Sequence, residues 1–317
     1  MTNDQIFSQS NLTYLLVTAI VGYSVYIIFG RTKKYPSNYV PSNQSDLIDF
    51  LHYHRRMVFN KRVIKTLKYV DRSKFLGENG KKDMKKYSDD PKPIGFNATI
   101  SAPHMHAIGL DLLGDFLPVG GRALDIGSGS GYVSACLSHM VGPSGKVIGV
   151  EHIEELVEQS KLNIESLDPK LLENIEFTTG DGLIGYAEGG PYDVIYAGAA
   201  APTLPIDLIN QLKPNGRMVI PVGPENLFHE LMVVTKDANS KITITSQGVV
   251  RFVPLTSKEK QMAVDHLPNV TKVHNIGGQK TLVRVDYFPA PDTANLKKIE
   301  EELNKKIQES SKNKIVQ

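Results

Sequence analysis

The glycine-rich stretch at residues 123–151, ALDIGSGSGYVSACLSHMVGPSGKVIGVE, constrains the fold of this chain more than any other segment. A short apolar run ends near Asp125, glycines at positions 127, 129 and 131 open a turn, and residues 132–140 carry apolar side chains at helical spacing. A second extended run, residues 146–150, ends at Glu151. This order predicts a nucleotide-binding unit. Closely spaced glycines let the main chain approach a ligand, and Glu151 can accept hydrogen bonds from two ribose hydroxyls.

The residues around the turn favour S-adenosylmethionine over a dinucleotide. The glycines follow a G-x-G-x-G spacing, with Tyr132 where the dinucleotide fingerprint would continue. Asp125 precedes the turn, and a carboxylate does not suit a pyrophosphate, which prefers bare amide donors. S-adenosylmethionine carries an ammonium and a sulfonium and no phosphate, so it matches the acidic residue. Two alternatives remain open from the motif alone, a nicotinamide oxidoreductase and a glycine turn that only lets strand and helix pack closely.

Strands and helices alternate after Glu151. We expect helices at residues 153–166 and 205–212 and strands at residues 175–178, 192–197, 217–221, 231–236 and 248–254, with a further strand at 281–288. This alternation predicts an α/β fold with a doubly wound, mostly parallel sheet covered on both faces. Asp125, Glu151 and Asp181 each end a predicted strand. Because ligands bind beyond the carboxyl ends of such strands, these three carboxylates should meet in one crevice.

The N-terminal segment predicts a membrane anchor. Residues 5–30 contain no charged side chain, and residues 12–29 (LTYLLVTAIVGYSVYIIF) are nearly long enough to cross a bilayer as a helix. Arg31, Lys33 and Lys34 follow directly. Basic residues on this side predict a single-pass helix, with the part of the chain after it facing the cytoplasm. A cleaved signal peptide and a buried helix are the alternatives.

The remaining organisation follows from local composition. Residues 1–34 form the predicted anchor, 35–45 a linker, 46–262 the catalytic domain, and 263–317 a C-terminal extension with a charged tail. Within the domain, residues 47–60 and 61–76 should form two amphipathic helices, and residues 77–93 a surface loop. Lys and Arg number 36 against 34 Asp and Glu, so no nucleic-acid partner is expected. The one cysteine, Cys136, excludes an internal disulfide, and a structural zinc site is not expected.

The segment PIGFNATISAPHMHA at residues 93–107 is the least generic in the chain. Pro103 is well placed in the first turn of a helix. Ser101 would then lie near the N-cap, where its simplest role is capping. His104 and His106 are two residues apart on the predicted helix and point to different faces, so we expect no metal site there.

Several separated motifs together resemble the protein-L-isoaspartate (D-aspartate) O-methyltransferase family. The resemblance covers about residues 46–261, and its motifs are DRSKF from Asp71, the ATISAPHMHA segment, ALDIGSGSGY, GKVIGVEHIEELVEQS, GDG, PYDVIYAGAAAP, QLKPNGRMVIPVG and VPLTSKEKQ. It implies a Rossmann-like S-adenosylmethionine-dependent methyltransferase. Such an enzyme methylates the free α-carboxylate of L-isoaspartyl and D-aspartyl residues in damaged proteins, which initiates repair, and releases S-adenosylhomocysteine.

The resemblance also implies the site. Ser101 matches the catalytic serine of the family. The positions that match the cofactor-lining residues are Ala98, Thr99, Ile100, Ser101, His106, Gly127, Glu151, His152, Ile153, Asp181, Gly182, Leu183, Thr256 and Gln261. From charge and placement, we expect Asp125 beside the ammonium of the cofactor, Asp181 at the adenine amine, and Gly129 in the binding turn. No metal cofactor is implied.

The chemistry needs alignment more than a general base, because an isoaspartyl carboxylate is already ionised at neutral pH. Damaged proteins and a membrane are the expected partners, and the sequence predicts no oligomeric state. The family is otherwise cytoplasmic, and the apolar segment before Arg31 and the tail lie outside the resemblance. A catalytically inactive, membrane-tethered adaptor is therefore the rival reading. The retention of Ser101, Asp181 and Gln261 argues against it.

Overall fold

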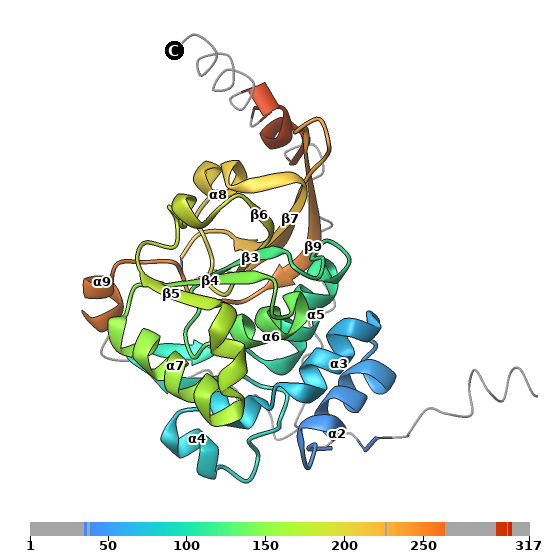
Figure 1. Ribbon diagram of the computed structural model, residues 1–317, viewed down its shortest axis with the longest axis vertical. Coiled ribbons are helices and arrows are strands. Elements are labelled where there is room, and N and C mark those ends of the chain that lie inside the picture. Colours follow the sequence, from blue (N-terminus) through green and yellow to red (C-terminus); the bar gives the residue numbers. More distant parts are fainter. Residues whose placement is uncertain (1–34, 37–38, 226, 264–295, 303, 306–317) are drawn as a thin grey trace, which may run out of the picture.

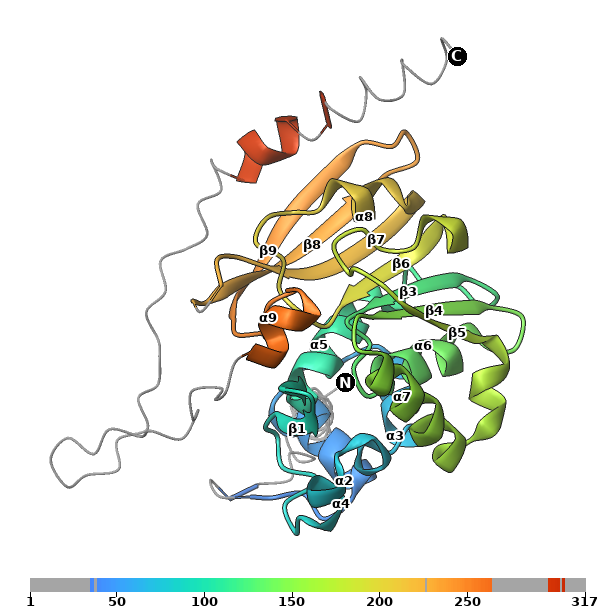
Figure 2. The same ribbon diagram turned by 90° about the vertical axis from the view of Figure 1, so that its left-hand side faces the viewer.

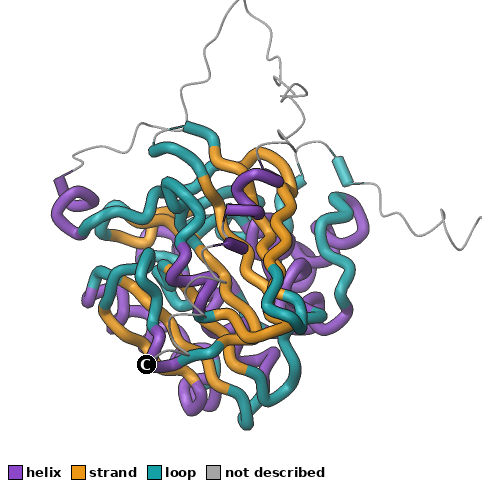
Figure 3. Tube along the Cα trace, turned by 90° about the horizontal axis from the view of Figure 1, so that it is seen from above, coloured by secondary structure: helices purple, strands orange, loops and turns teal. Residues whose placement is uncertain are grey.

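The computed structural model describes residues 35–36, 39–225, 227–263, 296–302 and 304–305. A seven-stranded sheet in the order β5-β4-β3-β6-β7-β8-β9 runs through the middle of this described part (Figures 1 and 3). Neighbouring strands from β5 to β7 are parallel, and β8 and β9 are added antiparallel. The bounds are β3 (Arg122–Ile126), β4 (Lys146–Glu151), β5 (Ile175–Thr179), β6 (Tyr192–Ala197), β7 (Leu212–Val222), β8 (His229–Lys236) and β9 (Ile242–Val250). The predicted mostly parallel, Rossmann-like sheet is confirmed.

The register of the central strands places their carboxyl ends level with one another. Ile126 of β3 pairs with Val150 of β4 on one side and with Ala197 of β6 on the other. Both strands are almost fully buried, as expected for short apolar runs covered on two faces. β3 is the first parallel strand in the chain. The next strands, β4 and β5, lie on one side of it, and β6 and β7 lie on the other, so the strand order reverses at β3. A crevice therefore opens beyond the end of β3.

Helices cover both faces of the sheet, so the core has two parts. On one face lie α5 (Pro103–Gly114), α6 (Tyr132–Val141) and α7 (Glu154–Leu167) (Figure 2). The other face is covered by α8 (Ile206–Asn210) and by the helical residues 296–302, whose Leu296 and Ile299 pack against the second core. Two short 3₁₀ turns, η3 (Pro169–Asn174) and η4 (Ala187–Gly189), complete this part.

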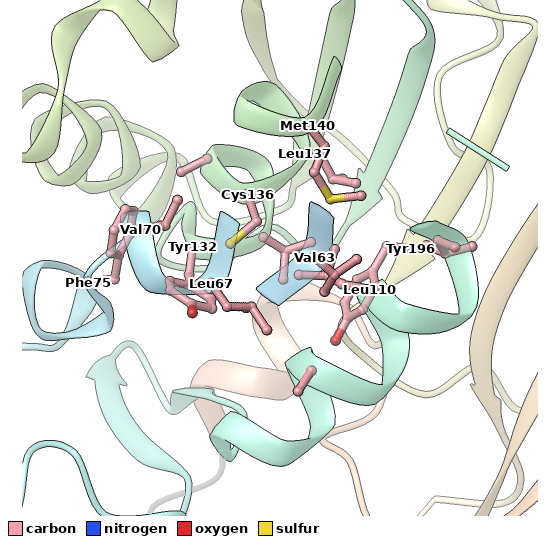
Figure 4. Packing of buried hydrophobic residues seen from close by; sticks show 14 of the residues in the cluster. Val63, Leu67, Val70, Phe75, Leu110, Tyr132, Cys136, Leu137, Met140 and Tyr196 are labelled. Atoms are coloured by element: carbon pink, nitrogen blue, oxygen red, sulfur yellow. The ribbon is translucent and has the colours of Figure 1, made fainter. Parts of the chain in front are cut away.

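A layer of N-terminal helices packs over α5 and α6. It comprises α2 (Gln44–Asp49), a π-helical turn η1 (Phe50–His54), α3 (Lys61–Tyr69) and a 3₁₀ turn η2 (Arg72–Phe75). Figure 4 shows Val63 and Leu67 of α3 facing Tyr132 and Cys136 of α6, and Cys136 is fully buried there. Both predicted helices form, but the first ends at His54 instead of residue 60. The second ends at Tyr69, and the chain then turns into η2 rather than continuing as one helix.

Two local predictions were wrong, and one hairpin was not predicted. Residues 77–93, expected to be a loop, contain α4 (Glu78–Lys82) and the start of β1 (Lys92–Gly95). β1 pairs antiparallel with β2 (Ala98–Ile100), a hairpin that pattern reasoning missed because each strand is too short to show a period of two. The helix expected at 205–212 ends at Asn210, and β7 already begins at Leu212.

The last strand is displaced from its predicted position. It spans Ile242–Val250 instead of residues 248–254, because Ile242 and Ile244 alternate with threonines against the second core. Residues after Val250 leave the sheet and cross its end, where Val253 and Leu255 exchange main-chain hydrogen bonds with Ala200 at 2.8 and 2.7 Å. This crossing brings the VPLTSKEKQ motif to the crevice.

The predicted transmembrane segment at residues 12–29 and the predicted strand at 281–288 lie outside the described residues. Within the part of the chain that the structure describes, no helix combines the length and the apolar character needed to cross a bilayer.

Candidate active site

Two adjoining cavities lie at the carboxyl ends of the central strands. The larger encloses about 600 Å³ and the smaller about 320 Å³ including the open space at their mouths, a size that suits a small-molecule ligand. Four residues line both cavities: Thr99, Gly127, Gly129 and Gly198. The larger is otherwise lined by Ala98, Val150, Glu151, His152, Gly180, Asp181, Gly182, Ala199, Val253, Pro254, Leu255, Thr256 and Gln261. The smaller is otherwise lined by Ile100, Ser101, His106, Asp125, Ser128, Ser130, Tyr132, Val133 and Tyr196.

The glycine turn is built around the Glu151 carboxylate. Gly127 and Gly129 have φ angles of 67° and 55°, a left-handed conformation that favours glycine. The N–H of Gly129 donates to Glu151 Oε2 at 2.9 Å, and the main-chain N–H groups of His152 and Ile153 donate to Oε1 at 2.8 and 3.2 Å. Glu151 is therefore fixed in orientation at the end of β4, at the wall of the larger cavity.

Asp125 lies at the back of the smaller cavity and is only 1% exposed. Burial raises the pKa of this carboxyl to about 7, the hydrogen bond from Ser134 lowers it, and the Glu151 charge raises it further. The Ser134 hydroxyl donates to Asp125 Oδ2 at 2.6 Å. A cation bound beside Asp125 would lower this pKa and favour the carboxylate. The site is therefore suited to an ammonium group.

The segment between β2 and α5 forms the opposite wall. Ala102, not Ser101, is the N-cap of α5, and Pro103 occupies the first turn. The simpler alternative, in which Ser101 only caps the helix, is therefore excluded, because the chain enters the helix one residue later. Ser101 is half-buried and lines the smaller cavity, while Thr99 lines both cavities.

The two histidines of this segment face different partners. His104 Nδ1 lies 2.8 Å from Asp89 Oδ1. His106 is buried, with Nδ1 3.4 Å from Nη1 of Arg72, and burial together with the nearby Arg72 and His104 holds the pKa of His106 well below its usual value. Within the described residues, no group of three or more His, Cys, Asp or Glu side chains could hold a metal ion.

Gln261 joins three elements over the larger cavity. It lies in α9 (Lys258–Ala263). Its Nε2 donates to the carbonyl of Phe96 at 2.8 Å, and its Oε1 lies 2.9 Å from His152 Nε2, which must be the donor because an amide oxygen only accepts. Asn97 Nδ2 in turn donates to the Gln261 carbonyl at 3.0 Å. We call these three hydrogen bonds the Gln261 clasp.

Asp181 follows β5 and lies at the edge of the larger cavity, with Oδ1 accepting the N–H of Leu183 at 2.8 Å. Leu183 and Ile153 line neither cavity. Ile153 is fully buried in the core and Leu183 packs partly buried against the second core, so their main-chain N–H groups orient Asp181 and Glu151 instead.

The structure brings all the other predicted site residues to the two cavities. Sequence reasoning missed Gly198 and Ala199 after β6, although the same strand-end argument that selected Asp125 would have found them. It also missed Ser128 and Ser130, although both lie in the predicted binding turn, and Tyr132 and Tyr196, whose helical and strand contexts give no sign of cavity exposure.

These residues fit S-adenosylmethionine. A fixed acidic side chain suits ribose hydroxyls, and a buried carboxyl suits an ammonium. In addition, the Ser128 hydroxyl is buried in the smaller cavity without a hydrogen-bond partner among the described residues. Such an orphaned polar atom calls for a polar ligand.

Comparison with known proteins agrees with this chemistry. The model of the protein-L-isoaspartate (D-aspartate) O-methyltransferase family matches residues 42–260. A probable protein-L-isoaspartate O-methyltransferase of Dictyostelium discoideum is 53% identical over 300 residues, with 93% of each chain covered. Protein-L-isoaspartate O-methyltransferase 1 of Arabidopsis thaliana is 49% identical over 212 residues, covering 66% of this chain and 90% of the relative.

The fold matches a solved structure as well. The crystal structure of a candidate protein-L-isoaspartate O-methyltransferase from Plasmodium falciparum, in complex with S-adenosyl-L-homocysteine, aligns with a TM-score of 0.61 at 33% identity. It covers 68% of this chain and 98% of that structure. On the family model, the relatives and the fold together, this chain belongs to the protein-L-isoaspartate (D-aspartate) O-methyltransferase family.

Proposed function

We propose that the two cavities form one catalytic cleft, in which a methyl group passes from S-adenosylmethionine to the free α-carboxylate of an L-isoaspartyl or D-aspartyl residue. The observation that carries this proposal is the shared boundary of the cavities at Thr99, Gly127 and Gly129. A ligand held by Glu151 on one side of the boundary would meet an acid group held by Ser101 on the other.

The cofactor-side residues have distinct tasks. S-adenosylmethionine supplies a methyl group made electrophilic by a sulfonium. Glu151 would accept the ribose hydroxyls, since its carboxylate is already oriented by three main-chain N–H groups. Asp125 would accept the ammonium, and Asp181 would accept from the adenine amine. The Gln261 clasp would hold the hairpin turn and α9 over the cofactor.

Ser101 would act on the substrate side. Its hydroxyl donates a hydrogen bond to one oxygen of the substrate carboxylate and so directs the other oxygen toward the methyl carbon. The carboxylate is ionised at neutral pH, so no residue has to remove a proton. Holding the reacting atoms in line contributes several kcal/mol. Transfer converts a carboxylate and a sulfonium into two neutral groups, which a water-poor cavity favours.

The replacement Ser101→Ala tests this role. We expect turnover on an isoaspartyl peptide to fall by about 100-fold or more, since one positioned donor contributes roughly that factor. The affinity for S-adenosylhomocysteine, measured by calorimetry, should stay close to that of the parent chain. A fully active variant would remove the role assigned to Ser101.

The inactive-adaptor alternative is tested on the parent chain. Methyl transfer to a peptide with one isoaspartyl residue is compared with transfer to the same peptide carrying aspartate. We expect transfer only to the isoaspartyl peptide. Binding of S-adenosylhomocysteine without transfer to either peptide would favour the adaptor.

We further propose that residues 12–29 anchor the enzyme in a membrane, with the catalytic domain in the cytoplasm. The uncharged run and the basic residues after it support this proposal. The Dictyostelium relative aligns over 93% of this chain, so it shares at least part of both extensions beyond residues 42–260.

Membrane anchoring is tested by cell fractionation. The full chain should stay with membranes after alkaline carbonate extraction, whereas a chain that starts at Tyr35 should be released. Protease added to sealed vesicles should cut the catalytic domain if it faces the cytoplasm. Extraction of the full chain by carbonate would disprove the anchor.

A further inference from the structure

Arg72, the arginine of the DRSKF motif, is a buried cation. The proposed methyl transfer assigns it no role. Its side chain is fully buried, and burial lowers its pKa to about 10, which still leaves it charged at neutral pH. The nearby Asp89 carboxylate is held instead by Arg55 and His104. A buried charge without a close ionic partner costs folding free energy, so the presence of Arg72 calls for a reason other than stability.

The contacts of Arg72 are poorer than those of Lys236, a second buried cation among the described residues. Lys236 Nζ donates to two carbonyls, those of Ile209 and Leu212, at 2.7 and 2.8 Å. The guanidinium of Arg72 reaches the carbonyls of Asp90 and Ile100 only at 3.3 and 3.5 Å. Its Nε has no hydrogen-bond partner among the described residues. Close hydrogen bonds to carbonyl groups therefore explain how Lys236 can be buried, but the longer contacts of Arg72 do not explain its burial.

The DRSKF motif places Arg72 behind His106, a residue that lines the smaller cavity. Asp71 caps η2 by accepting the N–H of Ser73 at 2.9 Å, and Gln44 of α2 accepts the N–H of Arg72 at 3.2 Å. These bonds point the guanidinium behind β2 and α5, where Nη1 meets Nδ1 of His106 at 3.4 Å. The N-terminal helical layer is thus connected to a residue that lines the smaller cavity.

An arginine can only donate hydrogen bonds, so Nδ1 of His106 must accept. The neutral ring then carries its proton on Nε2. We propose that Arg72 is a positioning residue: it fixes His106 in the Nε2–H form, so that a neutral N–H donor faces the cavity and binds a carboxylate there. That carboxylate belongs either to the amino-acid end of the cofactor or to the substrate. The inference rests on the proposed function of this cleft.

The ionisable groups around His106 come from several elements. Arg72 lies in η2, His104 in α5, Tyr132 in α6 with its ring 4.8 Å from that of His106, and Asp125 across the cavity in β3. Asp89 and Asp90 lie in the loop before β1. Because Arg72 lowers the His106 pKa in addition to burial, with His104 next in size, removal of Arg72 should raise this pKa.

The test compares Arg72→Met with Arg72→Lys and with Lys236→Met in the full chain labelled with ¹⁵N-histidine. The His106 signals, assigned with a His106→Gln variant, should show a protonated Nε2 and a bare Nδ1 in the parent chain and in Lys236→Met. Arg72→Met should show mixed tautomers and a higher pKa. Arg72→Lys should restore most of the parent pattern, because lysine also only donates.

Ligand binding identifies the carboxylate. In Arg72→Met we expect the Kd of S-adenosylhomocysteine to rise about tenfold, while that of methylthioadenosine, which lacks the amino-acid end, stays constant. A rise confined to the KM of the isoaspartyl peptide would assign the carboxylate to the substrate. That result would also support His106 as the N–H donor. Lys236→Met should lose thermal stability but keep both constants.

Two failures are distinguishable. If the parent chain neither binds S-adenosylhomocysteine nor methylates the isoaspartyl peptide, the proposed function fails. If the parent chain does both, and Arg72→Met keeps the parent tautomer, the Kd and the KM, then Arg72 is only a structural residue and the inference is overturned.

Discussion

At the scale of single residues, the site combines acids that differ in their surroundings. Glu151 is held by three main-chain donors, whereas Asp125 receives a hydrogen bond from Ser134 and is otherwise desolvated. A carboxyl with a pKa near 7 costs folding free energy whenever it ionises. The same carboxyl favours a bound cation, so Asp125 exchanges stability for cofactor binding.

Replacement of Asp125 by Asn should show this exchange. The folded pKa of Asp125 is about 7 against an ordinary 3.8, so its favourable contribution is complete below pH 3.8 and is lost as the pH rises through 7. Asp125→Asn should therefore match the parent chain near pH 4 and exceed its unfolding free energy by about 2 to 4 kcal/mol at pH 8, at about 1.4 kcal/mol per pKa unit. Denaturant titration at both pH values measures the difference.

The same variant should bind S-adenosylhomocysteine more weakly, by calorimetry at pH 8. Ser134→Ala is the matched control, because loss of its hydrogen bond raises the Asp125 pKa further. In that variant, the pH midpoint of ligand binding should move upward. Equal stability of Asp125→Asn and the parent chain at pH 8 would contradict the assignment.

At the scale of elements, short segments far apart in the chain close the cleft. The β1–β2 hairpin turns at Phe96 and Asn97, with φ angles of 52° and 56°, and α9 reaches it through the Gln261 clasp. Two positive φ angles match the tight hairpin turns that suit strand twist. Although 164 residues separate Asn97 from Gln261, the hairpin turn and α9 share two hydrogen bonds, from Asn97 to the Gln261 carbonyl and from Gln261 to the Phe96 carbonyl.

Gln261→Ala should therefore open the cleft. Its loss removes the bonds to Phe96 and to His152, so we expect S-adenosylhomocysteine to dissociate about tenfold faster, with a smaller change in the association rate. Stopped-flow displacement measures both rates. Lys258→Ala is the control, since its exposed ion pair with Glu155 at 3.3 Å contributes little. Equal dissociation rates in the two variants would exclude a clasp function.

At the scale of the whole molecule, the described helical residues 296–302 and 304–305 of the C-terminal extension pack against the sheet. β9 is an edge strand, and the side chain of Asn304 pairs with its main chain. Asn304 Oδ1 accepts the N–H of Ile242 at 2.8 Å, and Nδ2 donates to the Ile242 carbonyl at 3.1 Å. Glu300 accepts the N–H of Ile244 at 3.3 Å. The side chains of Asn304 and Glu300 thus pair with main-chain groups at the start of β9 that could otherwise pair with another chain.

Asn304→Ala should uncover part of this edge. We expect a fall in Tm of about 2 to 4 °C, as for the loss of about 1 kcal/mol in a domain of this size, and more association in light scattering at high concentration. Lys305→Ala, an exposed neighbour, should leave both unchanged. If the two variants behaved alike, the tail would not protect the edge.

The sequence by itself determined the sheet, the turn and the acids of the cleft. Strong periodicity and glycine spacing are local properties of the sequence. Combined with the rule that ligands bind at strand ends, they predict where the cleft lies. The family resemblance added Ser101, His106 and Gln261, which no period marks. The capping role that the sequence left open for Ser101 is not realised, because α5 begins at Pro103 with Ala102 as its N-cap.

Tertiary structure alone decided which distant residues meet. The hydrogen bonds between Arg72 and His106, between Asn97 and Gln261, and between Asn304 and Ile242 form only because whole layers of the fold pack together. It also decided the pKa of Asp125, because desolvation depends on everything that surrounds a group. The sequence determines which chemical groups each segment carries. Burial and long-range hydrogen bonds arise only when segments separated by many residues come together.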